Sequence, residues 1–102
     1  MTPAIACDLT ALAAEERALR SELARKVFGA VVERRELDRG FAFRIDLTLV
    51  SLAQAGEWIG LERRCCPFFD FRIDVGREGG AAWINITGGD GVKEFLRSEL
   101  RG

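Results

Sequence analysis

The 102-residue sequence contains no histidine and no tyrosine. Without histidine, neither a Ser-His nor a Cys-His nucleophile pair can be built within the chain. Zinc sites of the His₃ and Cys₂His₂ types are excluded for the same reason. General acid–base chemistry would fall to aspartate, glutamate, lysine or cysteine, and no spacing of these residues demands an enzyme. Whether the protein is an enzyme stays open, with the balance against it.

An excess of charge of one sign and long apolar runs are also missing. The net charge is −1, and acidic and basic residues are interspersed rather than gathered in blocks. A nucleic-acid partner requires a basic face, so we expect no nucleic-acid binding. No stretch approaches the roughly 20 apolar residues of a membrane span, so we expect no membrane partner either.

The N-terminal stretch MTPAIACDLT has neither the basic n-region nor the long apolar h-region of a signal peptide. We therefore expect a cytoplasmic protein, in which thiols stay reduced. The chain contains three cysteines, and this odd number argues against a closed disulfide framework.

Hydrophobic periodicity predicts a single α+β domain over residues 1–102. The predicted helices cover 9–28, 51–65 and 91–100, and the predicted strands cover 30–37, 41–48, 69–75 and 81–87. The order α-β-β-α-β-β-α favours a four-stranded, mainly antiparallel sheet with the helices on its apolar face. Its two α-β-β halves suggest an internal duplication, although no residue-level repeat is visible. The strand order is not determined by the sequence.

Three glycines carry local predictions. In the turn DRG, residues 38–40, Gly40 is expected at a position that tolerates positive φ. Gly56 and Gly60 lie one turn apart in the second predicted helix, and this spacing indicates close packing against another element.

The second predicted helix has clear start and stop signals. Ser51 and Gln54 form an S-x-x-Q capping box at its start. Pro67 biases Cys66 away from the helical region, so the helix should end at or near the cysteines.

The stretch LERRCCPFFDF, residues 61–71, places two cysteines side by side at this helix end. Adjacent Cα atoms lie ~3.8 Å apart, whereas a disulfide prefers ~4.4–6.8 Å, so a Cys65–Cys66 disulfide would be strained. Two adjacent thiolates that bridge one large soft ion avoid this restriction. Thiolates select soft or borderline metals such as Cu(I) and Zn(II), and by the same argument Hg(II) and As(III). The sequence therefore predicts a thiol-based binder of a soft metal or metalloid, without naming the ion.

Two further residues complete the predicted metal site. Cys7 supplies a third sulfur if the start of the first helix lies near the end of the second. Three sulfurs without histidine suit trigonal coordination better than a structural zinc site. Glu62 lies one turn before Cys66 and offers an oxygen ligand. The candidate ligands are therefore Cys65, Cys66, Cys7 and Glu62.

Two other functions stay open. In a thiol redox protein, Cys7 would attack or resolve onto Cys65 or Cys66, which requires Cα atoms within ~7 Å. In a protein-interaction module, the cysteines would be core residues, since free cysteine often packs as a small hydrophobe. Trp83, on the polar face of the sheet, would then mark a contact surface, with a homodimer as one option.

The motif LERRCCPF and the tail WINITGGDGVKEFL resemble a small family of uncharacterised bacterial proteins with an E-R-x-C-C-P-F core. The resemblance covers residues 57–97 well and the first half only in layout. Proteins of that family accompany heavy-metal resistance and regulator genes. The resemblance implies no activity and no catalytic residues, but it favours a thiophilic ion as the ligand of Cys65 and Cys66.

Overall fold

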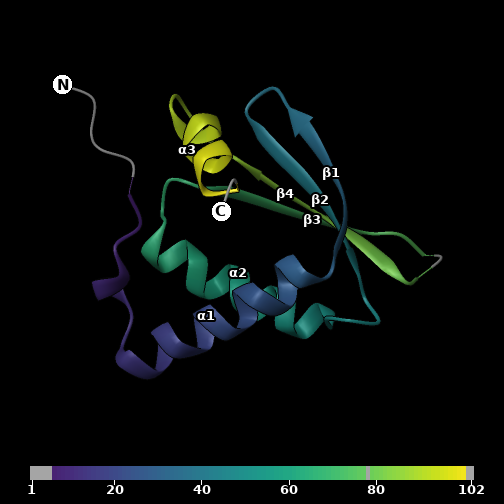
Figure 1. The fold of residues 1–102 in the computed structure, drawn as a ribbon, viewed down its shortest axis with the longest axis horizontal. Helices are drawn as coiled ribbons and strands as arrows, with labels where there is room; N and C mark the ends of the chain where they lie inside the picture. Colours follow the sequence, from purple (N-terminus) through teal and green to yellow (C-terminus); the bar gives the residue numbers. More distant parts are fainter. Residues whose placement is uncertain (1–5, 78, 101–102) are drawn as a thin grey trace.

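The computed structural model describes residues 6–77 and 79–100. The start of the N-terminal stretch, residues 1–5, lies outside this part, as do residues 78 and 101–102. The elements are a 3₁₀ turn η1 (Leu9–Ala11), the helices α1 (Ala14–Gly29), α2 (Leu52–Cys65) and α3 (Val92–Glu99), and the strands β1 (Val31–Leu37), β2 (Gly40–Asp46), β3 (Asp70–Val75) and β4 (Ala81–Thr87). The predicted α+β fold and the order α-β-β-α-β-β-α are confirmed (Figure 1). No helix in the described ranges is both long and apolar enough to cross a bilayer.

The four strands form one antiparallel sheet in the order β1-β2-β4-β3. The central pairing is between β2 and β4, with Phe43 opposite Ile84 and Ile45 opposite Ala82. These side chains are buried and point toward the helices, whereas Trp83 lies on the other face, half-buried, with the Arg35 guanidinium 4.5 Å from its ring centroid. The alternation along β4 therefore separates a core face of the sheet from a more solvated face.

The first helix begins later than the sequence predicts. Leu12 is extended rather than helical, and α1 starts only after Ala13. The carboxylate of Asp8 accepts a hydrogen bond from the Thr10 N–H, which closes η1 as a separate short turn. The Glu16 carboxylate accepts one from the Ala13 N–H, 2.9 Å away, which fixes the start of α1. Two local caps thus divide the predicted helix 9–28. The N-terminal segment, residues 6–12, is therefore not part of α1 and takes a separate direction.

Helix α2 has the boundaries that its sequence signals predict. The Ser51 hydroxyl accepts the Gln54 N–H at 3.0 Å, and the Gln54 side chain accepts the Ser51 N–H at the same distance. The helix ends at Cys65, and Cys66 follows in a non-helical conformation just before Pro67. The residues that it buries are Ala55, Trp58, Leu61, Glu62 and Cys65. The capping box and the proline therefore place the two cysteines at the end of a core-facing helix.

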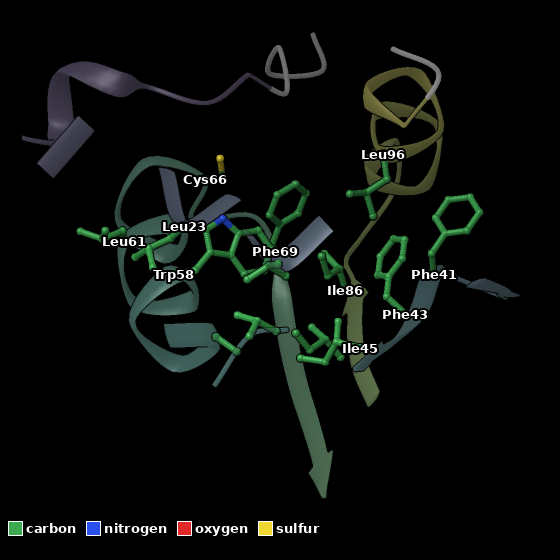
Figure 2. Packing of buried hydrophobic residues seen from close by; sticks show 14 of the residues in the cluster. Leu23, Phe41, Phe43, Ile45, Trp58, Leu61, Cys66, Phe69, Ile86 and Leu96 are labelled. Carbon is green, nitrogen blue, oxygen red and sulfur yellow. The ribbon is translucent and has the colours of Figure 1, made fainter. Parts of the chain in front are cut away.

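The core lies between the helices and the inner face of the sheet. Trp58 is at its centre and contacts Phe28 and Phe71 edge to face, with ring centroids 5.4 and 5.9 Å apart. Figure 2 shows Leu96 of α3 facing the same layer of sheet residues that includes Phe43. Edge-to-face aromatic pairs of this kind add to the free energy of burial. All three helices therefore pack against one continuous apolar layer.

The glycine predictions need correction. Gly40 opens β2 without a positive φ, and the described glycines with positive φ are Gly79, Gly80 and Gly91. A Cβ at Gly40 would lie 2.0 Å from the carbonyl oxygen of Ile86, so this residue is needed for close backbone approach instead. At Gly56 and Gly60 the opposite holds, because a Cβ there would meet nothing within 4 Å. The predicted close packing at Gly56 and Gly60 is wrong, since both positions are open.

Candidate functional site

The N-terminal segment, residues 6–12, runs along the end of α2. The Asp8 N–H donates to the carbonyl oxygen of Cys65 at 2.7 Å. The Arg64 guanidinium donates to the Ala11 carbonyl oxygen at 3.2 Å and forms an ion pair with Glu16. These contacts hold the N-terminal segment against the C-terminal end of α2, although the two are far apart in the sequence, and they position Cys7 beside that helix end.

Cys7 and Cys66 form a disulfide with a Cα–Cα distance of 4.6 Å. The structure thus brings Cys7 to the vicinal pair, as the redox hypothesis required and as the metal hypothesis needed for a third sulfur ligand. The reduced state expected for all three thiols is not the state found here. That expectation rested on compartment and on the odd number of cysteines, and neither determines which two cysteines lie close together. Cys66 is fully buried, and Cys7 is half-buried.

Cys65 keeps a free thiol and is completely buried. Its Sγ lies 3.7 Å from the Cys66 Sγ and 3.6 Å from the carbonyl oxygen of Glu62. The two neighbours are not linked to each other, in agreement with the strain predicted for such a bond. Burial raises the pKa of the Cys65 thiol, so this sulfur is protonated at neutral pH and is a weak nucleophile.

Glu62 places a buried carboxylate beside the disulfide. Its Oε2 accepts a hydrogen bond from the Arg20 Nε at 2.7 Å, and its Oε1 accepts one from the Arg20 Nη2 at 3.0 Å. The same Oε1 lies 3.4 Å from the Cys66 Sγ. Burial opposes the charge on Arg20, but the hydrogen bonds and the Coulomb attraction of Glu62 outweigh it and raise the pKa of the guanidinium. The pair carries two compensating charges into the site.

The sequence interpretation missed Arg20. A signal was present, because Arg20 precedes Leu23 and Val27 at helical spacing and so falls on the buried stripe of α1. A charge on that stripe calls for a buried partner of opposite sign. Glu62, placed on the buried face of α2, is that partner.

A pocket of about 640 Å³ opens beside the disulfide. It is lined by Ala6, Cys7 and Leu9 of the N-terminal segment, Arg20 and Phe28 of α1, Trp58 and Glu62 of α2, the core residues Phe69 and Ile86, and Phe95, Glu99 and Leu100 near the end of the chain. Cys7 contributes to its wall, whereas Cys66 and Cys65 lie behind it. The disulfide therefore joins a residue that lines the pocket to a fully buried residue.

The predicted metal ligands are only partly brought together. The Sγ atoms of Cys7 and Cys66 and a carboxylate oxygen of Glu62 all lie within 4.8 Å of one another. Cys65 is not a member of this set, although its sulfur is near that of Cys66. In the oxidised state described here, two of the three donor atoms are bonded to each other, so they can offer thiolates only after reduction.

Comparison with models of known protein families, with curated protein sequences and with solved structures finds no match for this chain. Its function is therefore inferred from the geometry of the cysteine cluster.

Proposed function

We propose that the protein is a thiol–disulfide redox protein and that Cys7 and Cys66 are its redox pair. The observation that carries this proposal is the disulfide between two residues that are 59 positions apart, one of which, the half-buried Cys7, lines an open pocket. A purely structural disulfide needs no access for a reacting thiol, whereas a redox-active one does. The position of Cys7 on the pocket wall supplies that access.

The exchange follows from which sulfur is accessible. A thiolate from a small dithiol or a low-molecular-weight thiol attacks the Sγ of Cys7, and the S–S bond breaks. The electron pair leaves on the Sγ of Cys66, which takes up a proton. A second external thiolate then attacks the mixed disulfide and releases Cys7. Two external thiols become one disulfide, and Cys7 and Cys66 become two thiols, so the electrons balance.

The surroundings of Cys66 determine the form in which it leaves. Its sulfur lies 3.4 Å from the Glu62 carboxylate oxygen that also accepts a hydrogen bond from the Arg20 Nη2. The carboxylate opposes a lasting negative charge on this sulfur, so Cys66 leaves as a thiol that takes up a proton, and the Arg20 guanidinium offsets part of the carboxylate charge. Burial raises the pKa of the Cys65 thiol, so Cys65 stays protonated and does not compete in the exchange.

A thiol count in redox buffers tests the proposal. In native conditions, mixtures of reduced and oxidised dithiothreitol should convert the chain reversibly between one and three free thiols, as counted by the mass added on alkylation. Cys65→Ser should keep this two-electron transition, because Cys65 is outside the pair. Cys7→Ser and Cys66→Ser should abolish it.

Two results would contradict the redox proposal. One is a disulfide that is reduced only when the far-UV circular dichroism shows unfolding, since this would make it structural. The other is a two-electron transition that survives in Cys7→Ser, since this would assign the chemistry to the vicinal pair.

A second candidate function is binding of a soft ion by the reduced chain. The observation that favours it is the cluster of donor atoms from Cys7, Glu62 and Cys66, all within 4.8 Å of one another. The Cys65 sulfur, 3.7 Å from that of Cys66, is the nearest further ligand. Hg(II), As(III), Cu(I) and Zn(II) suit thiolate ligands. The resemblance to proteins encoded beside heavy-metal resistance genes supports the same class of ion.

Ion binding is tested by titrating the reduced protein with Hg(II) or As(III) under exclusion of oxygen. We expect sulfur-to-metal charge-transfer absorption that saturates at one ion per chain. Cys7→Ser and Cys66→Ser should each lose most of it, and the oxidised wild type is the matched control without free Cys7 and Cys66. Stoichiometric binding that is unchanged in a Cys65→Ser, Cys66→Ser variant, or no binding at all, would reject this function.

A further inference from the structure

Strand β3 forms one edge of the sheet and carries charges that form no ion pair within the described part of the chain. Arg72 and Asp74 are exposed and take part in no ion pair among the described residues. Their partners on β4 are Asn85 and Trp83, which carry no charge. Among residues 6–77 and 79–100, these two edge side chains therefore have no ion-pair partner.

The other face of β3 leaves apolar surface in water. Ile73 and Val75 are 39% and 49% exposed, although they lie opposite the buried Ile84 and Ala82 of β4. They belong to the core face of the sheet, but the apolar layer stops beside them. An edge strand with exposed apolar side chains is a template for pairing with another strand.

The opposite edge of the sheet is protected in the usual ways. The register of β1 shifts between Val31 and Glu33, which breaks its regularity. Its acidic residues are also occupied, because Glu33 pairs with Arg35 and Glu36 pairs with Arg97. Irregular register and engaged charges discourage edge-to-edge association. By contrast, β3 pairs with β4 without interruption from Asp70 to Val75.

We propose that β3 pairs antiparallel with β3 of a second copy of this chain, about a two-fold axis that passes by Ile73. In this register Ile73 faces Ile73, Phe71 faces Val75, and Arg72 faces Asp74. The two-fold axis repeats the last two pairs, so each dimer has two Arg72–Asp74 pairs on one face and a continuous apolar strip on the other. The two sheets become one sheet of eight strands.

Charge and face select this register among its neighbours. A shift by one residue would pair Arg72 with Ile73 and turn the second sheet over, so that apolar and polar faces meet. A centre on Arg72 places Arg72 opposite itself and Asp70 opposite Asp74, which sets like charges against each other. A centre on Phe71 again pairs Arg72 with an acidic residue, Asp70, but leaves Ile73, Asp74 and Val75 without a strand partner. The Ile73 centre pairs residues 71–75 of each strand, as many residues as the Arg72 centre, and it opposes unlike charges.

A charge swap tests the dimer and its register together, with the dissociation constant measured by sedimentation velocity over a dilution series. Wild type should form a dimer in a concentration-dependent way. Arg72→Asp or Asp74→Arg sets two pairs of like charges opposite each other. Because each cross-strand pair is worth a few tenths to one kcal/mol, the dissociation constant should rise roughly 10- to 30-fold. The double variant Arg72→Asp, Asp74→Arg restores unlike pairs and should restore dimerisation.

Arg25→Asp is the matched control for Arg72→Asp. Arg25 is an exposed residue of α1 that makes no ion pair within the described ranges, and its substitution changes the net charge by the same amount. It should leave the dissociation constant unchanged.

A wild type that stays monomeric at the highest concentration overturns the proposal. The proposal is also overturned if both single variants have the dissociation constant of the wild type, or if the double variant dimerises as weakly as the single variants. Far-UV circular dichroism checks that each variant is folded. Arg72→Asp and Asp74→Arg change the same cross-strand pair, so if one of them does not fold, the other still tests the proposal.

Discussion

Reduction of the Cys7–Cys66 disulfide is expected to lower the free energy of unfolding by about 4 kcal/mol. The two cysteines are 59 positions apart, so the bond closes a large loop and removes many conformations from the unfolded chain. In the chain-entropy account, the stabilisation by a disulfide rises from about 3 kcal/mol for a 15-residue loop to about 4.7 kcal/mol for a 100-residue loop, and this loop lies between them. Because small proteins are stable by only about 5–15 kcal/mol, this is a large share of the total.

Urea denaturation of the oxidised and the reduced wild type measures this effect, with the midpoint and slope giving the free energy in each state. Cys7→Ser is the control, because it has no disulfide to lose and should be equally stable with and without reductant. Equal stability of the oxidised and reduced wild type would contradict the prediction. It would show that the N-terminal segment is held as well by its hydrogen bonds to α2 as by the covalent link.

Gly40→Ala is expected to cost about 3 kcal/mol or more and to impair folding. The added methyl group would lie 2.0 Å from the carbonyl oxygen of Ile86 and 2.8 Å from the Cα of Thr87. Both atoms belong to the backbone of β4, which pairs with β2 and β3 at once. The contact can be relieved only by moving a central strand away from its partner, and this weakens the pairing along β2.

Thermal or urea unfolding of Gly40→Ala and Gly56→Ala gives the comparison. The substitution is the same at both sites, but a methyl group at Gly56 meets nothing within 4 Å in the middle of α2. Alanine in a helix is favoured over glycine by roughly 0.5–1 kcal/mol, so Gly56→Ala should be stabilising. If Gly40→Ala were as stable as wild type, β2 and β4 would not approach each other as described.

The fold was predictable because its signals are local. The alternation of Phe41, Phe43 and Ile45 along one strand and the capping box of Ser51 each depend on a few neighbouring residues, and the structure confirms both elements. Strand order was not predictable, because alternation determines which face of a strand is buried but not which strand lies beside it. The start of the first helix was wrong for a related reason. Leu12 fits the helical stripe and is buried, yet two competing caps hold it in an extended conformation.

The site was predictable in its cysteines and in Glu62, but not in Arg20 and not in its arrangement. The sequence singled out Cys7, Cys66 and Glu62, which do lie together. That Cys7 is bonded to Cys66 rather than held beside Cys65 depends on how the N-terminal segment meets the end of α2. This meeting is made by Arg64 and by the backbone of Asp8, over 50 positions apart in the sequence. No local pattern reports such a contact.

The place of β4 between β2 and β3 has a consequence for a chain that is made from its N-terminus onward. When β2 leaves the ribosome it has β1 on one side only, and the strand that completes it is more than 30 residues from being synthesised. During that interval the open side of β2, with Phe43 and Ile45, is an unpaired apolar edge. Each α-β-β half forms its own hairpin, β1–β2 or β3–β4, and the two hairpins join through β2 and β4. The open edge of the first hairpin is therefore covered only when the last strand pair of the second half has been made.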